Sequence, residues 1–132
     1  MGRENESENE TRDRLSGAVL GAAIEVHRAL GPGLLEAVYE ECLCHELNIG
    51  GIQFARQVPL PIQYKGVYLD CGYRMDLVVE DQLILEVKSV ERLLPLHDAQ
   101  LLTYLKLSGI KKGLLLNFNA RVLKQGVRRL VL

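Results

Sequence analysis

The chain has 132 residues, a length that fits one domain with a substantial buried core. Hydrophobic residues make up 48% and charged residues 25%, which is ordinary for a globular protein and excludes a disordered chain. No apolar run approaches the roughly 20 residues of a membrane-spanning helix, and the polar, acidic N-terminus excludes a signal peptide. We therefore predict a single cytoplasmic domain over residues 11–132, without a membrane role, preceded by an acidic flexible tail over residues 1–10.

The net charge of −1 hides an asymmetry. The last third of the chain, from Ala99 to Leu132, contains no Asp or Glu but several Lys and Arg residues. This basic segment could face a polyanion. Surface charge that balances the acidic remainder of the chain is the alternative, and charge alone favours it.

The three cysteines are Cys42, Cys44 and Cys71. An odd number without an even framework favours reduced thiols in the cytoplasm. Cys42-x-Cys44-His45 resembles half of a zinc site, but residues two apart on a helix point to different sides, and no second ligand pair follows.

The first half of the chain predicts two helices followed by extended segments. Apolar residues recur every three or four positions over residues 11–30, which is the helical period. After the break at residues 31–33, a second helix runs to about Asn48 and ends at a pair of glycines. Residues 52–64 contain two prolines and therefore predict a strand near a sheet edge, with a turn at residues 63–67 into a second strand.

The second half predicts strands at about residues 72–79 and 83–90, then a helix at about residues 95–108. Leu114 to Leu116 indicate a short buried strand. Residues 120–128 predict a last helix, after which residues 130–132 could add a final strand.

Two carboxylates and a lysine interrupt the apolar runs of the expected 72–90 hairpin. If residues 80–82 form its loop, Asp76 lies directly opposite Glu86, and facing Cβ atoms are about 4.5–5.5 Å apart. A loop of two residues would instead turn Glu86 to the other face of the sheet. Lys88 lies two positions after Glu86 and therefore shares its face.

This pattern has two interpretations. In the first, Asp76 and Glu86 share a divalent cation with the Val87 carbonyl, because hard cations prefer oxygen ligands. Lys88 would then stabilise negative charge on a phosphodiester. In the second, the hairpin is half exposed, Asp76 and Glu86 point to solvent, and Glu86 forms a weak surface ion pair with Lys88. The first interpretation requires a loop of odd length or a bulge.

Three further residues favour the first interpretation, although each is also compatible with a structural role. Glu36 borders the apolar stripe of the second helix and supplies a third carboxylate. Gln100 and Tyr104 are four apart on the 95–108 helix and share a face. Gln100 could position water or a phosphate oxygen, and Tyr104 could pack or donate a hydrogen bond.

The segment G-L-L-E-A-V-Y, from Gly33 to Tyr39, resembles the signature of the GxxExxY proteins of the PD-(D/E)xK nuclease-like superfamily. Similar segments, among them Y-R-M-D-L-V-V-E, L-E-V-K and A-Q-L-L-T-Y-L-K-L, extend the resemblance from about Leu15 to about Leu130. It implies an α/β fold with a restriction-endonuclease-like core. This core is a mixed central sheet of about four strands, with a possible edge strand and flanking helices.

The resemblance also implies roles for individual residues. Asp76 and Glu86 match the Mg²⁺ ligands of the superfamily, and Mn²⁺ is an alternative ion. Glu36 matches the helical carboxylate that can complete the metal site, and Lys88 matches the catalytic lysine.

Gln100 and Tyr104 match the Q-x-x-x-Y element of RecB-like nucleases. Met75 stands where the motif name has proline, a departure that is common in the superfamily.

We therefore expect a Mg²⁺-dependent nuclease that hydrolyses phosphodiester bonds in DNA or RNA. Two alternatives stay open: a nucleic-acid-binding module without turnover, and a protein-interaction domain, for example a homodimer. The net charge near zero and the low aromatic content of 5% leave the last alternative open.

Overall fold

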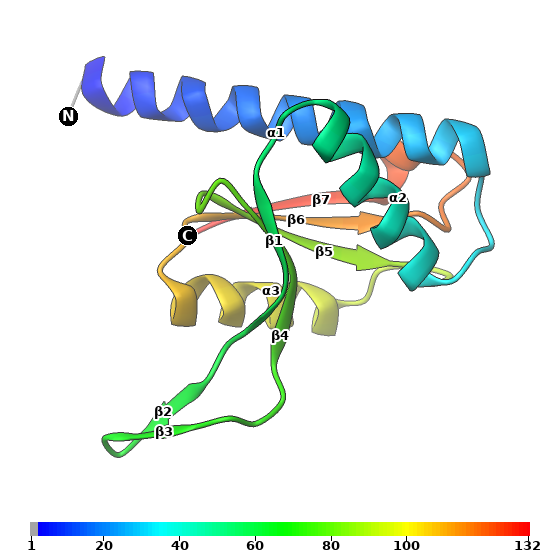
Figure 1. Cartoon of the computed structure of the whole chain (residues 1–132). Coiled ribbons are helices and arrows are strands. Elements are labelled where there is room, and N and C mark those ends of the chain that lie inside the picture. The colour runs from blue at the N-terminus through cyan, green and yellow to red at the C-terminus, as the bar shows by residue number, and fades with distance from the viewer. Residues whose placement is uncertain (1–2) are drawn as a thin grey trace.

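The computed structural model describes the backbone of residues 3–132 and the side chains of residues 14–132. It has three layers (Figure 1). Helices α1 (Arg3–Leu30) and α2 (Glu36–Ile49) cover one face of a central sheet, and α3 (Pro95–Ser108) covers the other. None of the described helices is both long and apolar enough to cross a membrane.

The central sheet has five strands in the order β1-β4-β5-β6-β7. Their bounds are β1 Phe54–Pro59, β4 Arg74–Val79, β5 Leu83–Lys88, β6 Lys112–Asn117 and β7 Val127–Val131. Only β5 and β6 pair in parallel, and the other neighbours are antiparallel. The expectation of a mixed sheet flanked by helices is confirmed, and the proline-containing strand β1 lies at an edge as predicted.

The ends of the chain differ from the sequence expectations. Helix α1 begins at Arg3 and not near residue 11, so its backbone includes most of the predicted tail. The flexibility expected for residues 1–10 stays a prediction. The predicted helix at residues 120–128 is wrong: a short 3₁₀ helix, η1 (Leu123–Gly126), leads into β7. Strand β5 pairs with one edge of β6. Strand β7 pairs with the other edge and so satisfies the backbone groups of β6 there.

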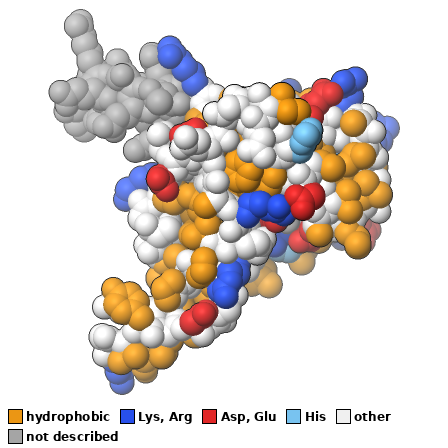
Figure 2. Space-filling view, in the orientation of Figure 1, with side chains coloured by type: hydrophobic (Ala, Val, Ile, Leu, Met, Phe, Trp, Pro, Cys, Tyr) orange, Lys and Arg blue, Asp and Glu red, His pale blue; other side chains and the backbone are white. Residues whose placement is uncertain are grey.

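A small hairpin extends from the body between β1 and β4 (Figure 1). It consists of β2 (Ile62–Tyr64) and β3 (Val67–Leu69), which form a separate two-stranded sheet. We call residues 62–69 the hairpin arm. Its turn residues both have positive φ, as a tight hairpin turn requires. Figure 2 shows hydrophobic side chains gathered on the arm, and Tyr64 and Tyr68 are exposed.

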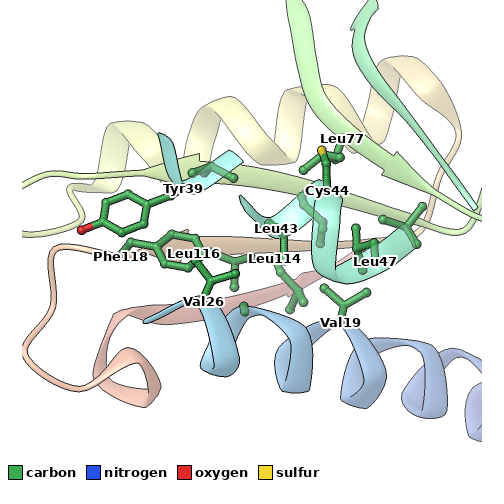
Figure 3. Packing of buried hydrophobic residues seen from close by; sticks show 14 of the residues in the cluster. Val19, Val26, Tyr39, Leu43, Cys44, Leu47, Leu77, Leu114, Leu116 and Phe118 are labelled. Atoms are coloured by element: carbon green, nitrogen blue, oxygen red, sulfur yellow. The ribbon is translucent and has the colours of Figure 1, made fainter. Parts of the chain in front are cut away.

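Each face of the sheet carries its own hydrophobic core. The larger core lies between the sheet and helices α1 and α2, with Val19, Leu43 and Leu77 among its members (Figure 3). The smaller core packs α3 against the opposite face and includes Ile84 and Tyr104. Strand β5 therefore lies between two cores, and the interpretation of a half-exposed hairpin is wrong.

Tyr39, the last residue of the G-x-x-E-x-x-Y segment, joins three parts of the structure. Its hydroxyl donates to the Gly31 carbonyl at 2.6 Å and accepts the Leu34 N–H at 3.1 Å. Its ring stacks on Phe118, with ring centroids 4.7 Å apart. The Phe118 N–H in turn donates to the Lys88 carbonyl at 2.9 Å. Tyr39 thus connects the loop before α2 to the end of β5.

Gly113 tests the packing of α3 on the sheet. A Cβ at Gly113 would lie 2.7 Å from Leu101 Cδ1, closer than side chains approach one another. We expect Gly113→Ala to lower the free energy of unfolding by about 1–3 kcal/mol, the usual cost of an overpacked core. The matched control is Gly17→Ala on α1, where no atom lies within 4 Å of the new Cβ. That variant should gain about 0.5–1 kcal/mol through helix propensity. Urea unfolding of both variants measures the difference, and equal midpoints would contradict this account.

Candidate functional site

The β4–β5 hairpin has the three-residue loop that the metal interpretation requires. Val79 pairs with Leu83 and Leu77 pairs with Leu85, so the same register places Asp76 opposite Glu86. The backbone ladder ends at the Leu77–Leu85 pair, and β4 and β5 diverge beyond it (Figure 1). We call this point the fork.

Two side-chain hydrogen bonds replace the backbone ladder at the fork. The Asp76 N–H donates to Glu86 Oε2 at 2.8 Å, and the Val87 N–H donates to Asp76 Oδ2 at 2.8 Å. The N–H and C=O of a residue in a strand point to the same side. The Val87 carbonyl therefore also faces the fork, where it adds a third oxygen beside the two carboxylates.

Burial makes the charged forms of these carboxylates costly. Glu86 is only 3% exposed. Removal from water, and then the nearby charge of Asp76, raise the pKa of Glu86 to about 8. The pKa of Asp76 is also raised, mainly by burial and further by the charge of Glu40, although the Val87 N–H and the Lys88 ammonium oppose the shift. Without a cation at the fork, the pair therefore retains a proton at neutral pH.

Gln100 and Tyr104 lie on the same side of the sheet as Glu86 and Lys88. Side chains alternate along β5, so Glu86 and Lys88 share a face with Ile84, which packs in the core beneath α3. Gln100 Nε2 donates to the Tyr104 hydroxyl at 3.0 Å. The pKa of Tyr104 is raised, first by burial and then by the negative charge of Glu86. The predicted pair thus meets and adjoins the fork.

Glu36 lies near the end of β5 but does not join Asp76 and Glu86. It is exposed at the start of α2, and its Oε2 accepts the Ser89 N–H at 3.3 Å. The Ser89 hydroxyl also donates to the Leu34 carbonyl at 2.6 Å. Among the residues whose side chains are described, no three His, Cys, Asp or Glu side chains are grouped so that they could hold a metal ion.

A different carboxylate of α2, which sequence reasoning missed, lies nearer to Asp76. Glu40 is buried and accepts hydrogen bonds from Arg56 at 2.9 Å and from Gln57 Nε2 at 2.9 Å. Gln57 Nε2 also lies 3.4 Å from Asp76 Oδ1. The sequence signal was weak: Glu40 directly follows the motif tyrosine, and Gln57 lies in a strand with no visible pattern.

Asn117 is a second residue that the sequence did not single out. It is buried at the end of β6, where its Oδ1 accepts the Val90 N–H at 3.1 Å and its Nδ2 donates to the Val90 carbonyl at 3.0 Å. These two hydrogen bonds fix the chain just after Lys88. The polar residue that ends the apolar run L-L-L-N was the available signal.

The basic residues of the last third are distributed over several elements. Lys106 lies in the last turn of α3, Lys124 lies in η1, and Arg128 and Arg129 lie in β7. Arg128 forms an ion pair with Asp98, so its charge is already balanced within the protein.

The donor set at the fork fits a magnesium ion despite the small number of carboxylates. Mg²⁺ is usually held by one or two carboxylates and several waters. The carboxylate oxygens that accept a backbone N–H retain a second lone pair. A bound cation would also stabilise the ionised form of buried Glu86 and half-buried Asp76, a pair that otherwise retains a proton. The arrangement can therefore bind a hard divalent ion next to an ammonium group.

The raised carboxyl pKa values predict a pH-dependent stability of the metal-free protein. Because the folded state holds its protons more tightly than the unfolded state, the stabilisation is complete below the unfolded pKa of about 4.5. It is lost as the pH rises through the folded value of about 8. The free energy of unfolding should fall between these values in urea titrations with a chelator present.

Glu86→Gln should reduce this pH dependence and be more stable than the parent at pH 8. Its amide oxygen can still accept the Asp76 N–H, but it carries no charge. Glu91→Gln at an exposed position is the control and should keep the parental slope. A parental slope in Glu86→Gln would show that Glu86 is not the titrating group.

The comparisons with known proteins agree with this geometry. No curated protein and no solved structure matches the chain. Residues 13–130 match the family model described as the PD-(D/E)XK nuclease superfamily, which covers most of the sequence. The chain therefore belongs to the PD-(D/E)XK nuclease superfamily.

Proposed function

We propose that this protein is a nuclease that uses a divalent metal ion to hydrolyse phosphodiester bonds in DNA or RNA. The observation that carries the proposal is the interlocked pair at the fork. Glu86 is buried and Asp76 half-buried, each accepts a backbone N–H, and both have a raised pKa. Carboxylates with perturbed pKa values next to a lysine are a common feature of catalytic sites.

Asp76, Glu86 and the Val87 carbonyl are the proposed direct ligands of Mg²⁺, with Mn²⁺ as the expected substitute. Glu36, one turn before Glu40 on α2, is proposed to act through a bound water. When bound, the metal ion would supply positive charge for the phosphate and lower the pKa of a coordinated water.

The chain's own side chains then position the reacting groups. Lys88 shares a face with Glu86. Its positive charge partly opposes the rise in the pKa of Asp76 and of Glu86, so its ammonium group lies close enough to interact with both carboxylates. From there Lys88 can stabilise negative charge that develops on a phosphate oxygen. Gln100 and Tyr104 approach from α3 and can hold the nucleophilic water or a phosphate oxygen.

Two features near the fork support a nucleic-acid substrate. A cavity of about 290 Å³ adjoins the site and includes Gln100, Tyr104 and Tyr73 in its uncharged lining. Its size and aromatic wall suit a nucleobase better than a phosphate. The hairpin arm starts at the same end of β4 and exposes Tyr64 and Tyr68, side chains on which bases of a single strand stack.

Two narrower assignments also remain proposals. Membership of the GxxExxY group rests on residues 33–39, and a cytoplasmic location rests on the free thiols of Cys42, Cys44 and Cys71.

The exposed arm also favours one alternative function. An apolar hairpin outside the body is a typical contact for a second protein chain, so the same fold without turnover could serve as an interaction module or a homodimer. Nucleic-acid binding that weakens with salt, without cleavage, would instead identify a silent nucleic-acid-binding module.

Cleavage of labelled single- and double-stranded DNA and RNA with Mg²⁺ or Mn²⁺ tests the proposal. We expect Asp76→Asn and Glu86→Gln each to lower the single-turnover rate by at least about 100-fold, because metal-ion charge stabilisation is worth several kcal/mol. Lys88→Met should lower the rate but leave the affinity for Mn²⁺ nearly unchanged, since Lys88 is not a ligand.

Asp81→Asn is the matched control, because Asp81 lies in the same hairpin but in its exposed loop. It should cleave at the parental rate. The absence of metal-dependent cleavage on all four polymers, or equal rates for Asp76→Asn and the parent, would refute the nuclease assignment.

A further inference from the structure

The backbone of Gln57 is unusual for its place in the fold. Four residues other than glycine have positive φ in the described part of the chain. Three of them, Lys65, Glu80 and Asp81, lie in tight hairpin turns, where this conformation is normal. Gln57 has a φ of 50° within strand β1, so a turn does not explain it. Glycine would adopt this conformation at lower cost than glutamine.

The same position interrupts the pairing of β1 with β4. Arg56 pairs with Leu77 and Val58 pairs with Met75, but the intervening Gln57–Asp76 pair is missing. Asp76 therefore lacks a ladder partner towards β1 as well as towards β5, where the ladder ends at Leu77. Its carboxylate takes its position from side chains and from the Val87 N–H.

The side chain of Gln57 lies between two carboxylates that would otherwise repel each other. Its amide nitrogen is 2.9 Å from Glu40 Oε1 and 3.4 Å from Asp76 Oδ1. The shorter contact anchors the amide, since 3.4 Å is long for a hydrogen bond. Glu40 is in turn fixed by Arg56 at 2.9 Å, and Arg56 also pairs with Glu41 at 2.8 Å.

We propose that Glu40 and Gln57 are positioning residues that set the orientation of the Asp76 carboxylate for the cation. Arg56 balances the charge of Glu40, and Gln57 bridges Glu40 to Asp76. We therefore assign Glu40 an indirect role through Gln57 and not the role of a ligand. The two amide hydrogens of Gln57 connect Glu40 to Asp76 Oδ1. Asp76 Oδ2 is held from the other side by Val87. This inference rests on the metal site proposed above.

The first test is Gln57→Gly, which removes the amide without changing the charge and relieves the positive φ. Isothermal titration of chelator-treated protein with Mn²⁺ should show an affinity about 10–100-fold below the parent, the usual effect of losing a residue that orients a metal ligand. The urea midpoint should equal or exceed that of the parent. Lys65→Gly is the matched control: it relieves the same φ of 50° in the hairpin arm and should leave Mn²⁺ affinity unchanged.

The second test compares two neighbouring carboxylates of α2. Glu40→Gln and Glu41→Gln each remove one partner of Arg56 and one negative charge. Only Glu40 contacts Gln57, so Mn²⁺ affinity should fall at least about tenfold in Glu40→Gln and stay near the parental value in Glu41→Gln.

Asp76→Asn separates failure of this inference from failure of the metal site. If Asp76→Asn loses Mn²⁺ binding while Gln57→Gly keeps it within about twofold, the positioning role is overturned and the site stands. If Asp76→Asn binds Mn²⁺ like the parent, or the parent binds none, the metal site falls and the positioning role with it.

Discussion

The reciprocal bonding of Asp76 and Glu86 is the constraint on which the other features of the site depend. Their carboxylates occupy the places of ladder partners at the fork, so the N–H groups of Asp76 and Val87 stay hydrogen-bonded where β4 and β5 separate. The same contacts bring buried Glu86 and half-buried Asp76 together, and two like charges at such a place are unfavourable without a counter-charge. Such a pair needs a nearby positive charge or a bound proton. Lys88 provides the positive charge, and the raised pKa values of Asp76 and Glu86 reflect the bound proton.

The surrounding elements hold β5 so that this pair stays fixed. Parallel pairing with β6 extends to Lys88, beyond the last β4 partner, and Asn117 bonds the backbone at Val90. Ser89 is bonded to the loop before α2. Glu86 therefore sits on a strand that is restrained on one edge and at its end, and Asp76 is bonded to this strand from β4. The edge of β5 that faces the fork is open to a ligand. Sites built on rigid elements hold their geometry better than sites on loops.

The sequence predicted those parts of the site that arise within one hairpin or one helix. Alternation placed Lys88 on the face of Glu86, and helical spacing paired Gln100 with Tyr104. The position of Asp76 opposite Glu86 followed only if the loop had three residues, and the structure has this loop. Glu40 and Gln57 could not be predicted in this way, because they meet Asp76 only through tertiary packing and an irregular backbone angle. Strand β7 was predicted only in part, at residues 130–132, for a related reason: its pairing compensates the open edge of β6, which no local pattern near residue 127 encodes.

The bonds of the Tyr39 hydroxyl change how its motif should be interpreted. The hydrogen bonds of Tyr39 go to Leu34 and Gly31 in the loop before α2, and its ring stacks on Phe118. Glu36 likewise meets a backbone amide beyond β5. Apart from the water-mediated role proposed for Glu36, the side chains of the G-x-x-E-x-x-Y segment thus bond to backbone groups that hold the loop before α2 and the end of β5. A related chain could therefore lose catalysis at the fork and still keep this segment. A shared G-x-x-E-x-x-Y motif would then indicate common ancestry but not enzymatic activity.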